Sequence, residues 1–141
     1  MKIYIASPFE LMPAVRTLHS LIEMDKQMKV ISSWHQMEHP KEPTHEYKEK
    51  MAILDLMDIE CADTLLLINP PNWIDVGTGG RHVEVGYAIA KRIPIVILGA
   101  RKSAMHFHPM IKSVVPDIHS KDPELLSELR RLSTCLRFTH A

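Results

Sequence analysis

The sequence has no excess of charge of either sign and no long apolar run. Lysine and arginine together number 17, as do aspartate and glutamate, in a chain of 141 residues. This balance gives no overall positive field to attract nucleic acid, so we expect no nucleic-acid partner. No segment approaches the about 20 consecutive apolar residues that cross a bilayer, and MKIYIASPF is too short for a signal peptide. We therefore expect no membrane partner.

Cysteine is scarce, and histidine is not. The two cysteines, Cys61 and Cys135, lie in apolar patterns typical of helices, which favours buried thiols in a reducing cytoplasm over a disulfide between them. None of the nine histidines stands in a motif with a known metal geometry. We expect no metal and no cofactor. His35 and His108 are candidates for a base or sugar contact, and an exposed loop position is the alternative for both.

Short apolar runs alternate with longer amphipathic segments along the chain. The runs at 63–69 and 93–99 are apolar without alternation, as in strands buried on both faces. The pattern predicts strands at 2–6, 29–34, 63–69, 93–99 and 113–118, and helices at 10–26, 44–60, 80–91 and 122–137. We therefore predict one α/β domain over 1–141: a flavodoxin-like, doubly wound open parallel sheet of about five strands with helices on both faces.

Glycine is also scarce, and its distribution is informative. Of five glycines, four lie in GTGGRHVEVGYA (77–88): three in its opening turn and the fourth, Gly86, near its far end. The turn follows a predicted buried strand, and ligands of such sheets bind at the carboxyl ends of the strands. We place Glu84 in the first turn of the next helix, where the helix dipole favours an ionised carboxylate. Such a group can attack an electrophilic carbon, or it can merely complement the dipole.

Four segments between about residues 2 and 98 resemble one enzyme family. They are KIYIASPF, ILDLMDIECADTLLL, DVG and VEVGYAIAKRIPIVIL. They are similar, in this order, to segments of nucleoside 2-deoxyribosyltransferases and the related 2'-deoxynucleoside 5'-monophosphate N-glycosidases. The resemblance implies Glu84 as nucleophile, Tyr4 as the residue that holds it, Asp55 as the acid for the leaving base and Asp75 as a sugar or base contact.

Each of these residues also has a plainer interpretation. Asp55 could be a solvated aspartate on a helix, and Asp75 could be a residue that forms a turn. Tyr4 could be a core tyrosine whose hydroxyl has a hydrogen-bond partner. We expect Asp63 to cap the start of the third strand rather than reach substrate. Trp34 is either a stacking surface for a base or part of the core.

The chain departs from the family in the turn before Glu84, which is longer and contains Gly79, Gly80 and Arg81. Glycine amides at a helix start beside an arginine form a plausible anion cradle, which points to a phosphorylated substrate. The alternative is that Arg81 pairs with a surface carboxylate. Ser7, after the first strand, could donate to a phosphate or a sugar hydroxyl.

The sequence therefore predicts an enzyme that cleaves or exchanges the N-glycosidic bond of a small-molecule nucleoside or nucleotide, with retention. A 2'-deoxy sugar is favoured because its oxocarbenium ion forms more easily. The alternative is a non-catalytic nucleotide-binding module on the same fold. The resemblance also implies a homodimer or higher homo-oligomer.

Overall fold

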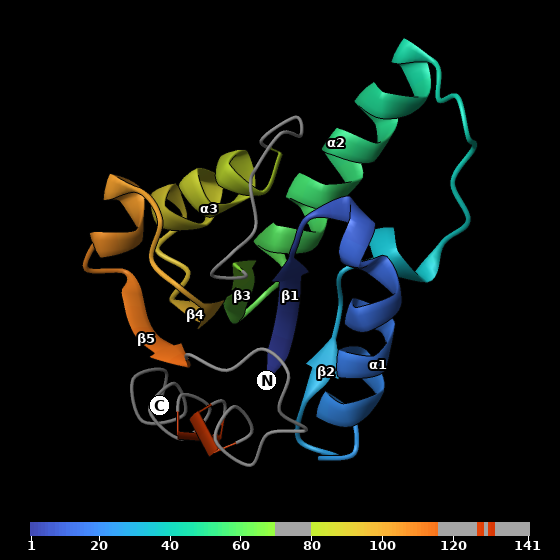
Figure 1. The fold of residues 1–141 in the computed structure, drawn as a ribbon. Helices are drawn as coiled ribbons and strands as arrows, with labels where there is room; N and C mark the ends of the chain where they lie inside the picture. The colour runs from blue at the N-terminus through green and yellow to red at the C-terminus, as the bar shows by residue number, and fades with distance from the viewer. Residues whose placement is uncertain (70–79, 116–126, 129, 132–141) are drawn as a thin grey trace.

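A computed structural model describes residues 1–69, 80–115, 127–128 and 130–131 of the chain. Within them five parallel strands form one sheet in the order β2-β1-β3-β4-β5 (Figure 1). The strands are β1 (Lys2–Ala6), β2 (Lys29–Val30), β3 (Thr64–Asn69), β4 (Ile95–Gly99) and β5 (Ile111–Val115). The predicted α/β fold with an open parallel sheet is confirmed.

The core lies in the three central strands. Every residue of β3 and β4 is buried, and so are the last four residues of β1. Tyr4 pairs in register with Leu65, which pairs in turn with Ile95. Burial on both faces explains why the runs of β3 and β4 are apolar without alternation.

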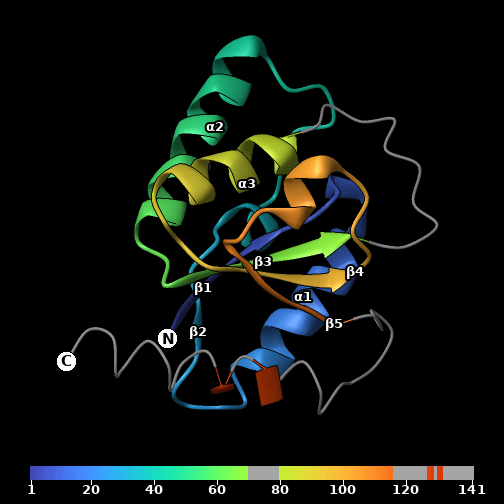
Figure 2. The same cartoon turned by 90° about the vertical axis from the view of Figure 1, so that its left-hand side faces the viewer.

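Helices cover both faces of the sheet. The main helices are α1 (Met12–Ile22), α2 (His45–Glu60) and α3 (Gly80–Ala90). Figure 2 shows α2 and α3 on one side of the sheet and α1 on the other. Thr44 caps α2 as predicted, since its side chain accepts the backbone N–H of Tyr47 at 3.1 Å. Short 3-10 helices η1 (Phe9–Leu11), η2 (Trp34–Gln36) and η3 (Ala104–Phe107) follow β1, β2 and β4.

The second strand is much shorter than the predicted 29–34, because side chains take over bonds to β1. The Ser32 hydroxyl accepts the Ile5 backbone N–H at 3.2 Å, and the Trp34 indole donates to the Ile5 carbonyl at 2.7 Å. The chain then turns into η2 instead of extending the sheet. Trp34 is buried, which favours its core interpretation.

Three further predictions need correction or lie outside the described residues. α1 ends at Ile22, and turns follow up to Met28. Cys61 is exposed, not buried, because it follows the last residue of α2 at the helix end. Cys135 and most of the predicted helix 122–137 lie outside the described residues.

The order of strands reverses between β1 and β3. The connection from β1 leads to β2 on one side, whereas β3 leads through α3 to β4 on the other. Open α/β sheets bind ligands at the carboxyl edge beside such a switch point. No helix of the described part of the chain is long and apolar enough to span a bilayer.

Candidate active site

Tyr4 and Glu84 meet beside the switch point. Tyr4 lies on β1 with none of its surface exposed, and its hydroxyl donates to Oε1 of Glu84 at 3.0 Å. Glu84 is the fifth residue of α3, so it lies beyond the first helical turn. The prediction that it lies within that turn is therefore wrong. This hydrogen bond joins two residues that are 80 positions apart in the chain. It holds one of the two carboxylate oxygens of Glu84.

Asp55 belongs to the same group of side chains. It lies on α2, and its charge acts on both Tyr4 and Glu84. Its Oδ1 atom is buried and has no hydrogen-bond partner among the described residues. The interpretation of Asp55 as a solvated helical aspartate is therefore wrong, since the carboxyl group lies under neighbouring elements. Burying a carboxyl oxygen without a hydrogen-bond partner costs free energy, and a ligand that donates a hydrogen bond to this oxygen would lower that cost.

The electrostatics of the pair differ from the expectation of an ionised Glu84. Burial, and then the charge of Asp55, raise the pKa of Glu84 to about 8. Burial, and then the charge of Asp58, raise the pKa of Asp55 to about 7. The helix dipole does not prevent this, because its effect falls off within the first turn and Glu84 lies beyond it. Burial also raises the pKa of Tyr4, which therefore stays a phenol and a donor.

Two interacting carboxyl groups lose their protons in steps that belong to the pair. Near neutral pH the pair therefore holds about one proton. The higher pKa of Glu84 places this proton mainly on Glu84 in the ligand-free protein. The Tyr4 hydroxyl donates to Glu84 and so favours its ionised form, and with Glu84 ionised the shared proton lies on Asp55. One ionised and one protonated carboxyl are the groups that a nucleophile and a general acid require.

A second polar group lies at the ends of β3 and β4. Arg81 is only 6% exposed, and its Nη2 donates to Oδ1 of Asn69 at 3.3 Å. Asn69, the last residue of β3, also donates to the Ala100 carbonyl. The buried ring of His106 accepts the Lys102 backbone N–H at Nδ1 over 2.8 Å. Arg81 is thus buried and held by the end of a strand.

Of the other predicted binding residues, Ser7 and Gly80 are among the described residues. The Ser7 hydroxyl donates to the Pro8 carbonyl at 2.9 Å, and Gly80 begins α3. Asp75 and Gly79 lie outside the described residues. Asp63 precedes β3, but its Oδ2 accepts the Lys2 backbone N–H at 2.7 Å, so its side chain bonds to the start of β1.

The two histidine candidates, His35 and His108, differ in their exposure to solvent. His35 is fully buried, and its Nε2 contacts the Ser32 hydroxyl at 2.8 Å, so it packs inside rather than lining a ligand site. Burial lowers the pKa of His35 to about 4. His108 is exposed, and its Nδ1 accepts the Met110 backbone N–H at 3.1 Å. No cluster of three or more metal-binding side chains forms within the described ranges.

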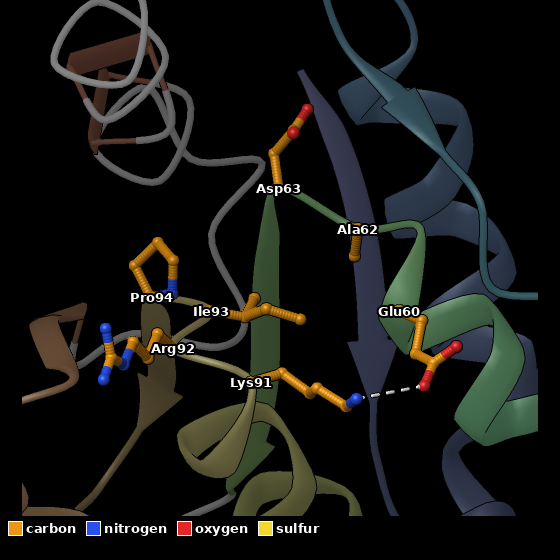
Figure 3. A pocket seen from close by; sticks show the side chains of 7 residues that line it. All are labelled: Glu60, Ala62, Asp63, Lys91, Arg92, Ile93 and Pro94. Atoms are coloured by element: carbon orange, nitrogen blue, oxygen red, sulfur yellow. Dashed lines mark ion pairs between the residues drawn. The ribbon is translucent and has the colours of Figure 1, made fainter. Parts of the chain in front are cut away.

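A hollow of about 520 Å³ lies at the opposite, amino edge of the sheet (Figure 3). Its lining includes Ala62, Ile93 and the ion pair between Lys91 Nζ and Glu60 Oε1 at 3.4 Å. Tyr87 donates a hydrogen bond to the same Glu60. None of the predicted catalytic residues lines this hollow, so it is separate from the Tyr4–Glu84 pair.

Three residues beside the predicted site residues are not predicted from the sequence: Asp58, which acts on Asp55, and Asn69 and His106, which lie by Arg81. Asp58 stands three positions after Asp55, a spacing that puts both on one helix face and could have drawn attention to it. Asn69 and His106 carry no such signal, because only the fold brings them beside Arg81.

No protein-family model matches the sequence, and no curated protein matches it. Solved structures do match, and two of them are enzymes that act on nucleosides or nucleotides. The 2-deoxyribosyltransferase of Bacillus psychrosaccharolyticus is 21% identical with a TM-score of 0.65, over 89% of this chain and 96% of its own. The CMP N-glycosidase of Clostridium botulinum is 18% identical with a TM-score of 0.60, over 92% of this chain and 98% of its own.

A conserved protein of Enterococcus faecalis V583 is also similar, with 20% identity and a TM-score of 0.65 over 93% of this chain and 98% of its own. The chain therefore has the fold of these three proteins. The transferase is of one of the two kinds that the sequence segments resemble. The other enzyme is a nucleotide N-glycosidase like the second kind, but its substrate CMP carries ribose and not 2'-deoxyribose.

Proposed function

We propose that the protein cleaves the N-glycosidic bond of a nucleoside or nucleotide, passing the sugar to water or to a second base. The observation that supports this most directly is the hydrogen bond from Tyr4 to Glu84, formed beside Asp55 at the switch point of the sheet. A core tyrosine needs a partner for its hydroxyl, but it has no need of two carboxyl groups with raised pKa values. The shared fold with a transferase and an N-glycosidase agrees with this proposal.

The first step forms a covalent intermediate. A carboxylate oxygen of Glu84 attacks C1' of the sugar as the C1'–N bond breaks and its electron pair goes to the base nitrogen. Asp55 gives its proton to that base, which leaves neutral. The Tyr4 hydroxyl holds Glu84 in one rotamer, so that the oxygen it does not contact is free to attack.

The second step reverses the roles. Asp55, now ionised, takes a proton from the incoming water or base as that group attacks C1'. The ester bond to Glu84 breaks, and its electron pair returns to the carboxylate. Two displacements at C1' give retention of configuration.

We propose a 2'-deoxy sugar, because its oxocarbenium-like transition state forms more easily. A 5'-phosphate would lie at the start of α3, where Gly79, Gly80 and Arg81 supply amides and a guanidinium. The Arg81 side chain is already fixed by Asn69 at this end of the sheet. Ser7 and Asp75, which follow the first and third strands in the sequence, would contact the sugar or base.

We also propose that the protein forms a homo-oligomer. Ile53 and Met57 on α2 are more than half exposed, and so is Val83 on the adjacent α3. These apolar side chains suit burial against a second copy. Light scattering on the purified protein would give a multiple of the chain mass, whereas the mass of one chain would contradict the proposal.

The activity is tested by incubating the protein with deoxynucleosides, ribonucleosides and their 5'-monophosphates, and measuring free base. Base release that Glu84→Gln abolishes supports the proposal. If no substrate releases base, alone or with a second base as acceptor, the enzyme proposal fails. The non-catalytic nucleotide-binding module then becomes the better account, provided that the same compounds still bind in calorimetry.

A further inference from the structure

A third carboxylate lies next to the pair that the proposed reaction uses. Asp58 follows Asp55 by one turn of α2, so the two side chains share a helix face. Its Oδ2 atom accepts the backbone N–H of Ser33 at 2.9 Å, across the sheet edge from α2. Asp58 is partly buried, and this bond fixes its position.

Several groups act on the Asp55 carboxyl from different elements. Tyr4 faces it from β1, Glu84 from α3 and Asp58 from its own helix. Tyr4 is a neutral donor, and it favours the ionised forms of both Glu84 and Asp55. Asp58 brings a fixed negative charge instead, which opposes the loss of a proton from its neighbour.

The anchor to Ser33 explains why the charge of Asp58 matters. A free aspartate on a helix would turn toward water, and its effect on a neighbour would be screened. The Ser33 N–H holds the carboxylate in one place, three residues from a carboxyl whose Oδ1 is buried and unpartnered among the described residues. Within the described residues, Asp58 is the one of the three carboxyl groups that accepts a backbone N–H.

We propose that Asp58 is a positioning residue, whose anchored carboxylate favours placing the shared proton on Asp55, from which the leaving base takes it. The inference rests on the proposed function, in which Asp55 is the general acid. As the C1'–N bond breaks, its electron pair goes to the base nitrogen, and the proton passes from Asp55 to that nitrogen. Asp58 takes no part in bond making, but it makes the protonated form of Asp55 persist to a higher pH.

The test separates the charge of Asp58 from its hydrogen bond. Asp58→Asn keeps an oxygen that can accept the Ser33 N–H and removes the charge. Asp58→Ser is a second neutral variant, for use if the first does not fold. Glu49→Gln, at an exposed position of the same helix, removes an equal charge away from the site and serves as the control.

The readout is the titration of the Asp55 carboxyl carbon by NMR in the substrate-free protein, assigned with Asp55→Asn. The titration midpoint of Asp55 should fall by about one pH unit or more in the neutral Asp58 variants and stay unchanged in Glu49→Gln. The Ser33 amide resonance reports whether the anchor survives. An unchanged Asp55 midpoint in a folded Asp58 variant would overturn the proposal.

A kinetic measurement distinguishes this proposal from the proposed function. If the protein releases base, the alkaline limb of kcat/KM should move to lower pH in Asp58→Asn, by the same amount as the Asp55 midpoint. A purely structural role would leave that limb in place, which would overturn the positioning role. If no substrate releases base, the proposed function fails, and the titration still decides whether Asp58 controls the proton on Asp55.

Discussion

Replacing Glu84 by glutamine should stabilise the protein at alkaline pH. The pKa of Glu84 is raised from its ordinary 4.5 to about 8, so ionising this side chain costs more in the folded than in the unfolded chain. At about 1.4 kcal/mol for each pKa unit, the difference sets an upper limit of about 5 kcal/mol. Glu84 is partly exposed, so solvent screens part of this cost, and glutamine accepts a weaker hydrogen bond from Tyr4. We therefore expect a gain of about 2 kcal/mol in the free energy of unfolding.

The sign of the effect depends on pH. A carboxyl whose pKa is raised on folding contributes stability below its unfolded value of 4.5, and this is lost as pH rises through about 8. Wild type and Glu84→Gln should therefore unfold at nearly the same urea concentration at pH 4, where both side chains are neutral. The variant should be the more stable protein at pH 9.5.

Urea denaturation of both proteins at the two pH values measures this difference directly. Glu49→Gln, an exposed change on α2, is the control and should shift neither value by more than about 0.5 kcal/mol. If Glu84→Gln is no more stable than wild type at pH 9.5, the carboxyl is not desolvated, and the account of a shared proton is wrong.

Three further variants test the remaining roles. Tyr4→Phe removes a hydrogen bond to a charged group, so kcat/KM should fall about tenfold to a hundredfold. The acid limb of the pH profile of kcat/KM should also move to higher pH, because this bond lowers the pKa of Glu84. An unchanged pH profile would contradict the contact between Tyr4 and Glu84. Asp55→Asn should slow substrates with poor leaving bases far more than those with good ones, and an equal loss in steady-state assays would exclude it as the acid. Arg81→Ala should weaken monophosphates about tenfold to a hundredfold more than nucleosides in calorimetry, and equal losses would remove the phosphate site.

Much of the fold is predictable from the sequence because hydrophobic periodicity reports burial. The unbroken apolar runs of β3 and β4 predict strands buried on both faces, and the structure places them at the centre of the sheet. The length of β2 is not predictable, because it depends on hydrogen bonds from Ser32 and Trp34 to the distant Ile5.

The candidate site is predictable in its members but not in its electrostatics. The family resemblance names Tyr4, Asp55 and Glu84 as members of one site, and in the structure these three side chains lie near one another. The protonation of Glu84 depends on how α3 packs over β1 and beside α2, which no local pattern encodes. For the same reason the influence of Asp58 on Asp55 emerges only once Ser33 is seen to hold it.

The central claim is that Glu84 forms a covalent bond to the sugar, and mass spectrometry of a trapped enzyme tests it most directly. A 2'-fluoro-arabino nucleoside, or its 5'-monophosphate, slows both displacements and lets the glycosyl-enzyme accumulate. We predict that the peptide containing Glu84 gains the mass of one fluorinated sugar, or sugar phosphate, and that Glu84→Gln gains none. Base release without any adduct, or an adduct on another residue, would contradict the assignment of Glu84 as the nucleophile.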